Sequence, residues 1–170
     1  MRLTFFFTVL SLSSLFSQIF PKGWTGKYEG TMEIFNGENK QQVAIDFELL
    51  ELKKDSSWTY KMTYTNSNQA PIVKDYLLQK TGASWTFQLD EKDGILIDIR
   101  LIGNVFYDFY EVNGMFFTSR LSKEKKGLFF ELMGGIKGDF RKTSTGITEI
   151  TDVYSYPPVF VQRVQLKKIN

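Results

Sequence analysis

Hydrophobic and polar residues alternate with a period of two over most of this chain. In the cleanest example, Trp58, Tyr60, Met62 and Tyr64 alternate with threonine and lysine. Such alternation is typical of β-strands that have one apolar and one polar face. Similar segments, separated by turn residues, cover 24–35, 43–49, 58–65, 72–80, 84–90, 95–102, 105–112, 115–121, 128–133, 136–142, 147–153 and 159–169.

The connections between these segments are mostly short. Asn36-Gly37 and Asn113-Gly114 favour tight hairpin turns, because both residue types tolerate a positive φ. Asp93-Gly94 and Gly103-Asn104 separate further segments in the same way. Short connections make consecutive strands antiparallel neighbours. The pattern therefore predicts an all-β, antiparallel up-and-down meander of about ten strands.

A meander of this size must bury its apolar face. It can do so by closing into a barrel or by folding over as a sandwich. We favour the barrel, because closure also removes exposed strand edges. Residues 18–170 show no linker and are expected to form a single domain.

The composition excludes more kinds of catalytic and metal sites than any motif does. The aromatic share is 16%, which favours strands, and the chain has neither His nor Cys. These absences exclude thiol nucleophiles, disulfides, zinc–thiolate sites and histidine-ligated haem. The formal net charge is only +2, with acids and bases intermixed, so no nucleic-acid footprint is visible. No metal or cofactor is expected.

The N-terminus has the layout of a secretory signal peptide. Met1-Arg2 is positive, 3–12 is apolar, and a serine-rich stretch ends at Ser17. We expect cleavage after Ser17, so that residues 1–17 are the signal peptide of a secreted or periplasmic, bacterial-type protein. The alternative is an uncleaved anchor, but the apolar run is shorter than the roughly 20 residues that span a membrane. After cleavage no membrane-spanning segment is expected.

The stretch Trp24-Thr-Gly26-Lys-Tyr28 has an aromatic–x–Gly–x–aromatic pattern at the start of the first strand. It resembles the entry strand of the calycin superfamily, which includes lipocalins, fatty-acid-binding proteins, avidins and nitrobindin-like proteins. These families usually have Trp where Tyr28 stands, or Trp24 takes that role in another register. The resemblance implies a calycin-like barrel around a small ligand, in which Arg163 of the last strand packs on one of these aromatics. It establishes no single family.

In-facing aromatic residues are the first candidates for a ligand site. A barrel of about ten strands has room for a small ligand, and apolar pockets with a few polar groups are typical binding sites. The same side chains could instead fill the core. The candidates are Trp58, Tyr60, Tyr64, Trp85, Phe87, Tyr107, Phe109, Phe117 and Phe130.

Arginine spacing suggests a second kind of site. Arg100, Arg120, Arg141 and Arg163 recur every 20 to 22 residues, about one hairpin apart. If they faced inward, pairs such as Arg120 and Arg141 could hold a carboxylate or phosphate group. The favoured alternative is that the arginines face outward and pair with neighbouring acids such as Asp98, Asp108 or Glu131.

Two further patterns carry little chemistry. The glycines of 134–138 lack the helix and the Ser/Thr of a phosphate loop, so a bulge or a barrel corner is favoured. Asp90, Glu91 and Asp93 share a turn, where carboxylates are usually solvated rather than catalytic.

The sequence therefore favours an exported protein that binds a small hydrophobic or amphipathic ligand inside a β-barrel. Three alternatives stay open: a barrel enzyme or isomerase, a ligand-free envelope or interaction protein, and a small outer-membrane barrel. Catalysis is less favoured than binding, and no catalytic residue is assigned. The outer-membrane barrel is disfavoured by charges on both faces of the last strand, at Arg163, Lys167 and Lys168.

Overall fold

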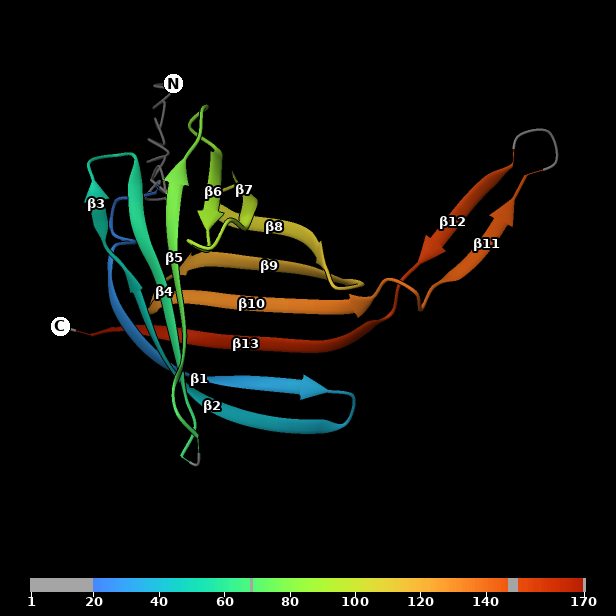
Figure 1. The fold of residues 1–170 in the computed structure, drawn as a ribbon, viewed down its shortest axis with the longest axis horizontal. Helices are drawn as coiled ribbons and strands as arrows, with labels where there is room; N and C mark the ends of the chain where they lie inside the picture. The colour runs from blue at the N-terminus through green and yellow to red at the C-terminus, as the bar shows by residue number, and fades with distance from the viewer. Residues whose placement is uncertain (1–19, 68, 147–149, 170) are drawn as a thin grey trace, which may run out of the picture.

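The structure is a computed structural model that describes residues 20–67, 69–146 and 150–169 (Figure 1). The predicted signal peptide lies outside these residues. The described chain contains strands and turns and no helix. The strands are β1 (Gly26–Asn36), β2 (Asn39–Leu49), β3 (Glu51–Lys53), β4 (Ser57–Thr65), β5 (Ile72–Lys80), β6 (Thr86–Asp90), β7 (Leu96–Ile102), β8 (Val105–Val112), β9 (Met115–Glu124), β10 (Gly127–Ile136), β11 (Arg141–Thr145), β12 (Thr151–Ser155) and β13 (Pro158–Ile169).

Ten of these strands close into an antiparallel barrel. From β4 to β10 each strand pairs with the next one along the chain, and β13 pairs with both β10 and β1. β2 closes the circle by pairing with β1 and with β4. The predicted all-β up-and-down barrel of about ten strands is confirmed.

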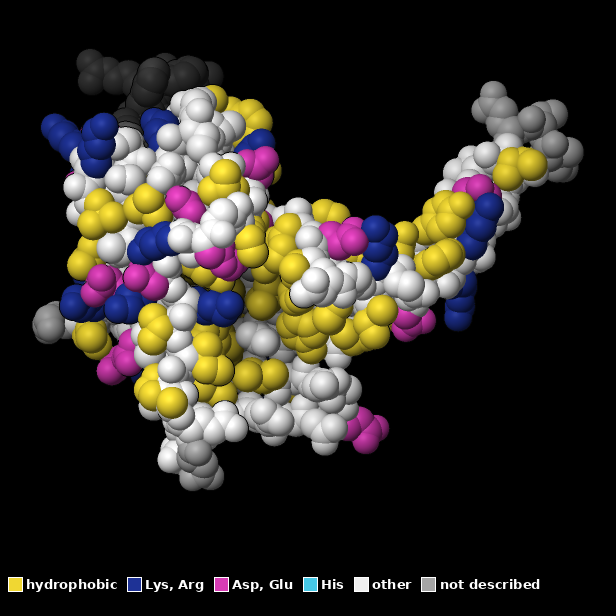
Figure 2. All heavy atoms as spheres, in the orientation of Figure 1, with side chains coloured by type: hydrophobic (Ala, Val, Ile, Leu, Met, Phe, Trp, Pro, Cys, Tyr) yellow, Lys and Arg dark blue, Asp and Glu magenta, His cyan; other side chains and the backbone are white. Residues whose placement is uncertain are grey.

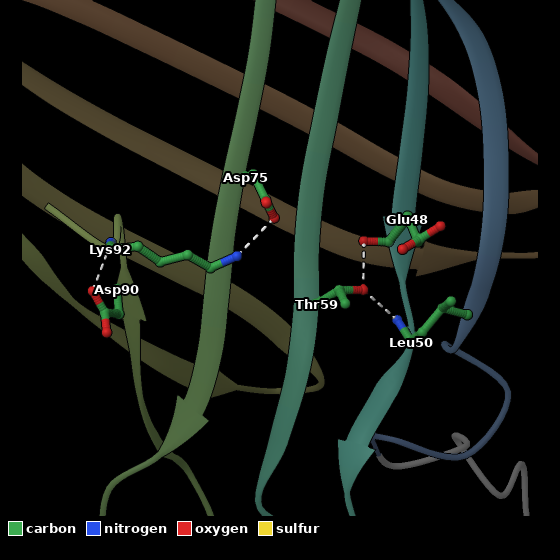
Figure 3. Close-up of polar contacts among 6 residues, drawn as sticks. All are labelled: Glu48, Leu50, Thr59, Asp75, Asp90 and Lys92. Atoms are coloured by element: carbon green, nitrogen blue, oxygen red, sulfur yellow. Dashed lines mark hydrogen bonds and ion pairs between the residues drawn. The ribbon is translucent and has the colours of Figure 1, made fainter.

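β2 and β3 are two parts of one strand along β4. The interruption lies at Leu50, opposite Thr59, whose side chain enters the hydrogen-bond ladder (Figure 3). The Thr59 hydroxyl accepts from the Leu50 N–H at 2.8 Å and donates to the Glu48 carbonyl at 3.3 Å. The Thr59 N–H in turn donates to the Leu50 carbonyl. A side chain thus keeps the strand continuous where the backbone ladder breaks.

The tight turns follow from residues that tolerate left-handed backbone. Asn113-Gly114 has φ values of 50° and 76°, and Gly103-Asn104 has 57° and 64°. Both φ pairs match the turn type expected for two-residue hairpins. At the first hairpin the prediction is shifted by one residue, because Asn36 stays in β1 opposite Asn39 while Gly37 takes the positive φ of 59°.

The segment between β10 and β13 differs from the expectation of two barrel strands at 136–142 and 147–153. β11 and β12 form a separate two-stranded sheet that projects from the barrel (Figure 1). Residues 147–149 lie outside the described chain. The register of β10 against β13 shifts between Gly134 and Gly135, so the predicted glycine bulge is confirmed. Tyr156 joins the projecting hairpin to the barrel by contacting Phe116, with ring centroids 4.9 Å apart.

Trp24 and Tyr28 are buried at the start of β1, and the Tyr28 hydroxyl donates to the Trp24 carbonyl at 2.5 Å. Gly30 lies where β13 passes closely, since a Cβ there would stand 2.7 Å from the Gln165 carbonyl oxygen. Gly26 begins β1 at φ 154°, with the Lys168 side chain where its Cβ would be. β13 therefore packs closely against the entry strand, through its backbone at Gly30 and through the Lys168 side chain at Gly26.

The predicted packing of Arg163 on Trp24 or Tyr28 is wrong. Arg163 lies opposite Glu33 and donates to its carboxylate, while its guanidinium stands 5.0 Å from the Phe35 ring centre on the outer face. The register explains this, because Tyr28 is opposite Lys168. A different cation serves the entry strand: the Lys168 ammonium donates to the Thr25 carbonyl at 2.7 Å.

Candidate functional site

The two ends of the barrel are filled differently. One end is where five strands begin, namely β1, β4, β6, β8 and β10. Five aromatic side chains fill the interior of the barrel there, with edge-to-face contacts. We call these residues the closed-end cluster: Phe20, Trp24, Trp58, Phe87 and Phe106.

Phe20 completes the closed-end cluster. Its ring centroid lies 4.7 Å from Trp58 and 4.9 Å from Phe106, and it also contacts Phe87 and Trp24. Aromatic pairs in this geometry stabilise a core beyond the area that they bury. The interior of the closed end is therefore a packed aromatic core.

The opposite end holds a cavity of about 580 Å³, hereafter the cavity. Its floor is buried and includes Tyr60, Met62 and Phe130, whereas its mouth includes the exposed side chains of Ile95 and Leu96. Hydrophobic side chains gather in a hollow beside β4 and β5 on the face shown in Figure 2. A volume of this size suits a small-molecule ligand.

The cavity opens through the side of the barrel as well as at its end. β5 starts at Ile72, yet it pairs with β6 only over 77–80. Similarly, β7 pairs with β8 only over 99–102, which leaves Leu96 and Ile97 without a ladder partner on that side. The short β6–β7 hairpin thus covers the cavity between β5 and β8 incompletely.

One ion pair joins the β6–β7 turn to β5 at the edge of this opening. Lys92, in the β6–β7 turn, donates to Asp75 of β5 at 2.9 Å, and the Lys92 N–H donates to Asp90 (Figure 3). A second pair, Lys137 with Glu111 at 2.8 Å, joins the end of β10 to β8 and does not cross the opening. These pairs are exposed, so they position the edge more than they stabilise the fold.

Asp108 is the unusual residue of the cavity floor. It lies between the in-facing Phe106 and Tyr110 of β8 and is only 8% exposed. Its carboxylate accepts from the Ser119 N–H at 2.7 Å and from the Ser119 hydroxyl at 2.5 Å. Burial raises the pKa of Asp108, and the two hydrogen bonds from Ser119 oppose this shift.

Four tyrosines surround the polar part of the cavity. Burial raises the pKa of Tyr64 to about 12. Burial, followed by the negative charge of Asp108, raises the pKa of Tyr110 to about 12 and that of Tyr60 well above its usual value. The pKa of Tyr76 is raised by burial and then by Glu91, with which it shares a hydrogen bond. All four phenols are therefore neutral near neutral pH and can donate hydrogen bonds.

The structure divides the predicted aromatic candidates into three groups. Tyr60, Tyr64, Phe117 and Phe130 line the cavity. Trp58 and Phe87 face inward but belong to the closed-end cluster. Trp85, Tyr107 and Phe109 face outward, and Phe109 is 72% exposed, so the prediction that these three line a cavity inside the barrel is wrong.

The error on β8 has a clear physical origin. Both faces of this strand carry aromatic residues and one acid, Asp108 on one face and Glu111 on the other, so the alternation within β8 does not show which face is the inner one. The register between β7 and β8 shows which face is the inner one. The Gly103-Asn104 turn places Leu101 opposite Phe106 and Ile99 opposite Asp108. Paired residues share a face, so the strongly apolar inner face of β7 requires Asp108 inside. The turn and the β7 pattern together were a signal in the sequence for this residue.

The arginines do not converge inside the barrel. Arg120 pairs with Glu131 at 3.0 Å on the outer face, Arg100 lies over Trp85, and Arg141 lies on the projecting hairpin. The predicted anion site at Arg120 and Arg141 is therefore wrong.

The regular arginine spacing has a structural explanation. Strand pairing joins Arg100, Tyr107, Arg120, Glu131 and Arg163 into one cross-strand row. This outer row accounts for Arg100, Arg120 and Arg163, which agrees with the favoured alternative of outward-facing arginines, whereas Arg141 lies outside it on the projecting hairpin.

In the described chain, no three Asp or Glu side chains are placed so as to bind a metal ion. Within the same residues, no helix has the length and apolarity needed to cross a bilayer. No family model matches the sequence, and neither a curated protein nor a solved structure matches it.

Proposed function

We propose that this protein is an exported binding protein that holds a small hydrophobic or amphipathic ligand inside its barrel. The observation that carries the proposal is the cavity, which has a buried floor and a mouth formed by exposed apolar side chains such as Leu96, 56% exposed. An exposed apolar rim around a buried pocket is typical of a site that receives an apolar molecule.

Export rests on the N-terminal pattern. Cleavage after Ser17 would retain Phe20, and Phe20 packs in the closed-end cluster. The mature chain would thus keep every described residue of the barrel. A calycin-like relationship is part of the same proposal, supported by the up-and-down strand order and the Trp24–Tyr28 entry pattern.

The outer face supports a water-exposed barrel rather than one in lipid. Arg120 pairs with Glu131, and Arg163 pairs with Glu33, both within strands rather than at their ends. A lipid-facing band would be apolar at these positions.

Native mass spectrometry of the protein purified from its secreted or periplasmic fraction tests binding directly. We expect a non-covalently bound molecule that Leu132→Trp displaces, because Leu132 lines the cavity. The matched control is Ile102→Trp, at an exposed position on the opposite end. Binding of N-phenylnaphthylamine should follow the same pattern. If neither a bound molecule nor probe binding is detected, the proposal fails.

A second function, proton transfer, is favoured by one observation. Asp108 is a buried carboxyl in an apolar cavity that also contains tyrosine hydroxyls, and such a group can serve as a general acid or base. In this reading the chain would accelerate deuterium exchange from heavy water at the carbon next to a carbonyl, and Asp108→Asn would abolish the effect. An apolar ketone that binds without faster exchange would refute catalysis of this exchange.

A further inference from the structure

The charged groups that line the cavity are mainly acidic. Asp108 and Glu91 contribute carboxylates, and Glu111 stands at the rim beside Lys137. Lys74 is the lysine among the lining residues, and its side chain is exposed at the mouth. The arginines of the described chain all lie outside the cavity. A carboxylate or phosphate ligand would therefore meet like charge on the floor.

Asp108 lacks a cationic partner within the described chain. Both of its oxygens accept hydrogen bonds from neutral Ser119 groups, and no Lys or Arg of the described residues lies within salt-bridge distance. A buried carboxylate without a counter-charge is costly. A ligand that brings a positive charge would reduce this cost, so the floor is built for a cation more than for a neutral or anionic group.

The tyrosines supply a second, independent feature. Tyr60 is 8% exposed and lines the cavity. Tyr110 and Tyr64 line the same cavity, and the charge of Asp108 influences both Tyr60 and Tyr110. Aromatic rings beside a carboxylate recognise ammonium groups through cation–π attraction and charge.

We propose that the cavity binds an amphipathic amine, with its ammonium group against Asp108 beside Tyr60 and Tyr110 and its apolar body directed toward Leu96 and Val112 at the mouth. This inference rests on the proposed binding function and names the ligand class. The formal net charge of the chain is +2, so the protein as a whole does not attract cations. A preference for a cation must then come from the cavity itself.

Isothermal titration calorimetry with three probes of equal chain length tests the inference near neutral pH, below their micelle-forming concentrations. The probes are decylammonium, decanol and decanoate. We expect decylammonium to bind at least about tenfold more tightly than decanol, and decanoate to bind most weakly, since one close charge pair in a buried site is worth this much or more.

Variants then locate the preference. Asp108→Asn keeps the side-chain shape and should lower decylammonium affinity by about tenfold or more while leaving decanol affinity unchanged. The control Asp98→Asn removes a carboxylate from the outer face of β7, where it accepts from Gln88, and should change neither. If Asp108→Asn does not fold, the three-probe order in the natural sequence still decides.

The outcomes separate the inference from the function on which it rests. If decanol or decanoate binds as tightly as decylammonium, the amine class is rejected while a hydrophobic binding function stands. If Asp108→Asn binds decylammonium unchanged, Asp108 is not the recognising group and the inference is overturned. If none of the three probes binds and no bound molecule is found by mass spectrometry, both proposals fail.

Discussion

The closed and open ends of this barrel contain similar residues that do different things. At the closed end, Phe20, Trp58 and Phe106 pack edge to face and leave no room for a ligand. At the open end, Tyr60 and Tyr110 stand around a cavity with Asp108 on its floor. Aromatic content alone therefore does not define a binding site. What matters is whether the rings contact one another or an open space.

The sharpest test of this comparison removes one phenylalanine from each end. Phe106→Ala should lower the free energy of unfolding by about 3–5 kcal/mol, because it opens a void in the packed closed-end cluster. Phe117→Ala should cost less than half of that, since Phe117 is only partly buried and already borders the cavity. Urea denaturation measures both values. Equal losses at the two ends would contradict the comparison.

The second prediction concerns pH. Burial raises the pKa of Asp108 above 3.8, so the folded chain holds this proton to a higher pH than the unfolded chain does. Stability from this group is complete below pH 3.8 and is lost as the pH rises through the raised pKa. The Asp108→Asn variant should therefore gain stability over the natural sequence above that pKa and match it in acid. Urea denaturation over a pH series checks this, and parallel curves would be the contrary result.

The third prediction asks whether the closed end needs an arginine from the last strand. The exposed Arg163 pairs with the half-buried Glu33 on the outer face, away from Trp24 and Tyr28. Arg163→Ala should therefore cost no more than about 1 kcal/mol. A loss of several kcal/mol in urea denaturation would restore the closure role that the calycin resemblance implied.

The smallest effect on stability is expected at the edge of the opening. Lys92→Ala removes the pair with Asp75 and should cost less than about 1 kcal/mol. The same change should speed ligand dissociation, because this pair joins the β6–β7 turn to β5 beside the cavity. Stopped-flow dissociation of N-phenylnaphthylamine measures the rate. The control Lys40→Ala removes a comparable exposed pair with Glu33 and should leave the rate unchanged.

The alternation of hydrophobic and polar residues was enough to predict most of the fold. The Trp58–Tyr64 alternation and the Asn113-Gly114 turn depend only on neighbours in sequence, and both predictions hold in the structure. The prediction that Tyr107 and Phe109 of β8 face inward is wrong, and alternation alone could not correct it, because each face of β8 carries aromatic residues and one acid. Its register with β7, fixed by Gly103-Asn104, places Asp108 inside.

The sequence could not predict which in-facing residues fill the core and which line the cavity. Trp58 and Tyr60 are two residues apart on the same face of β4, yet one packs in the closed-end cluster and the other lines the cavity. Nothing in their local pattern distinguishes them. Their difference depends on Phe20, which fills one end from a distant part of the chain.

The sequence by itself determined that this chain forms antiparallel strands with one apolar face, because alternation and turn chemistry are local properties of the backbone. Only the tertiary structure decided which apolar residues pack together and which surround a space. That outcome depends on closure of β2 against β4, on the unpaired edges of β5 and β7, and on which side chains reach each end of the barrel. These are contacts between residues far apart in the sequence, and they place the buried Asp108 at the centre of the proposed site.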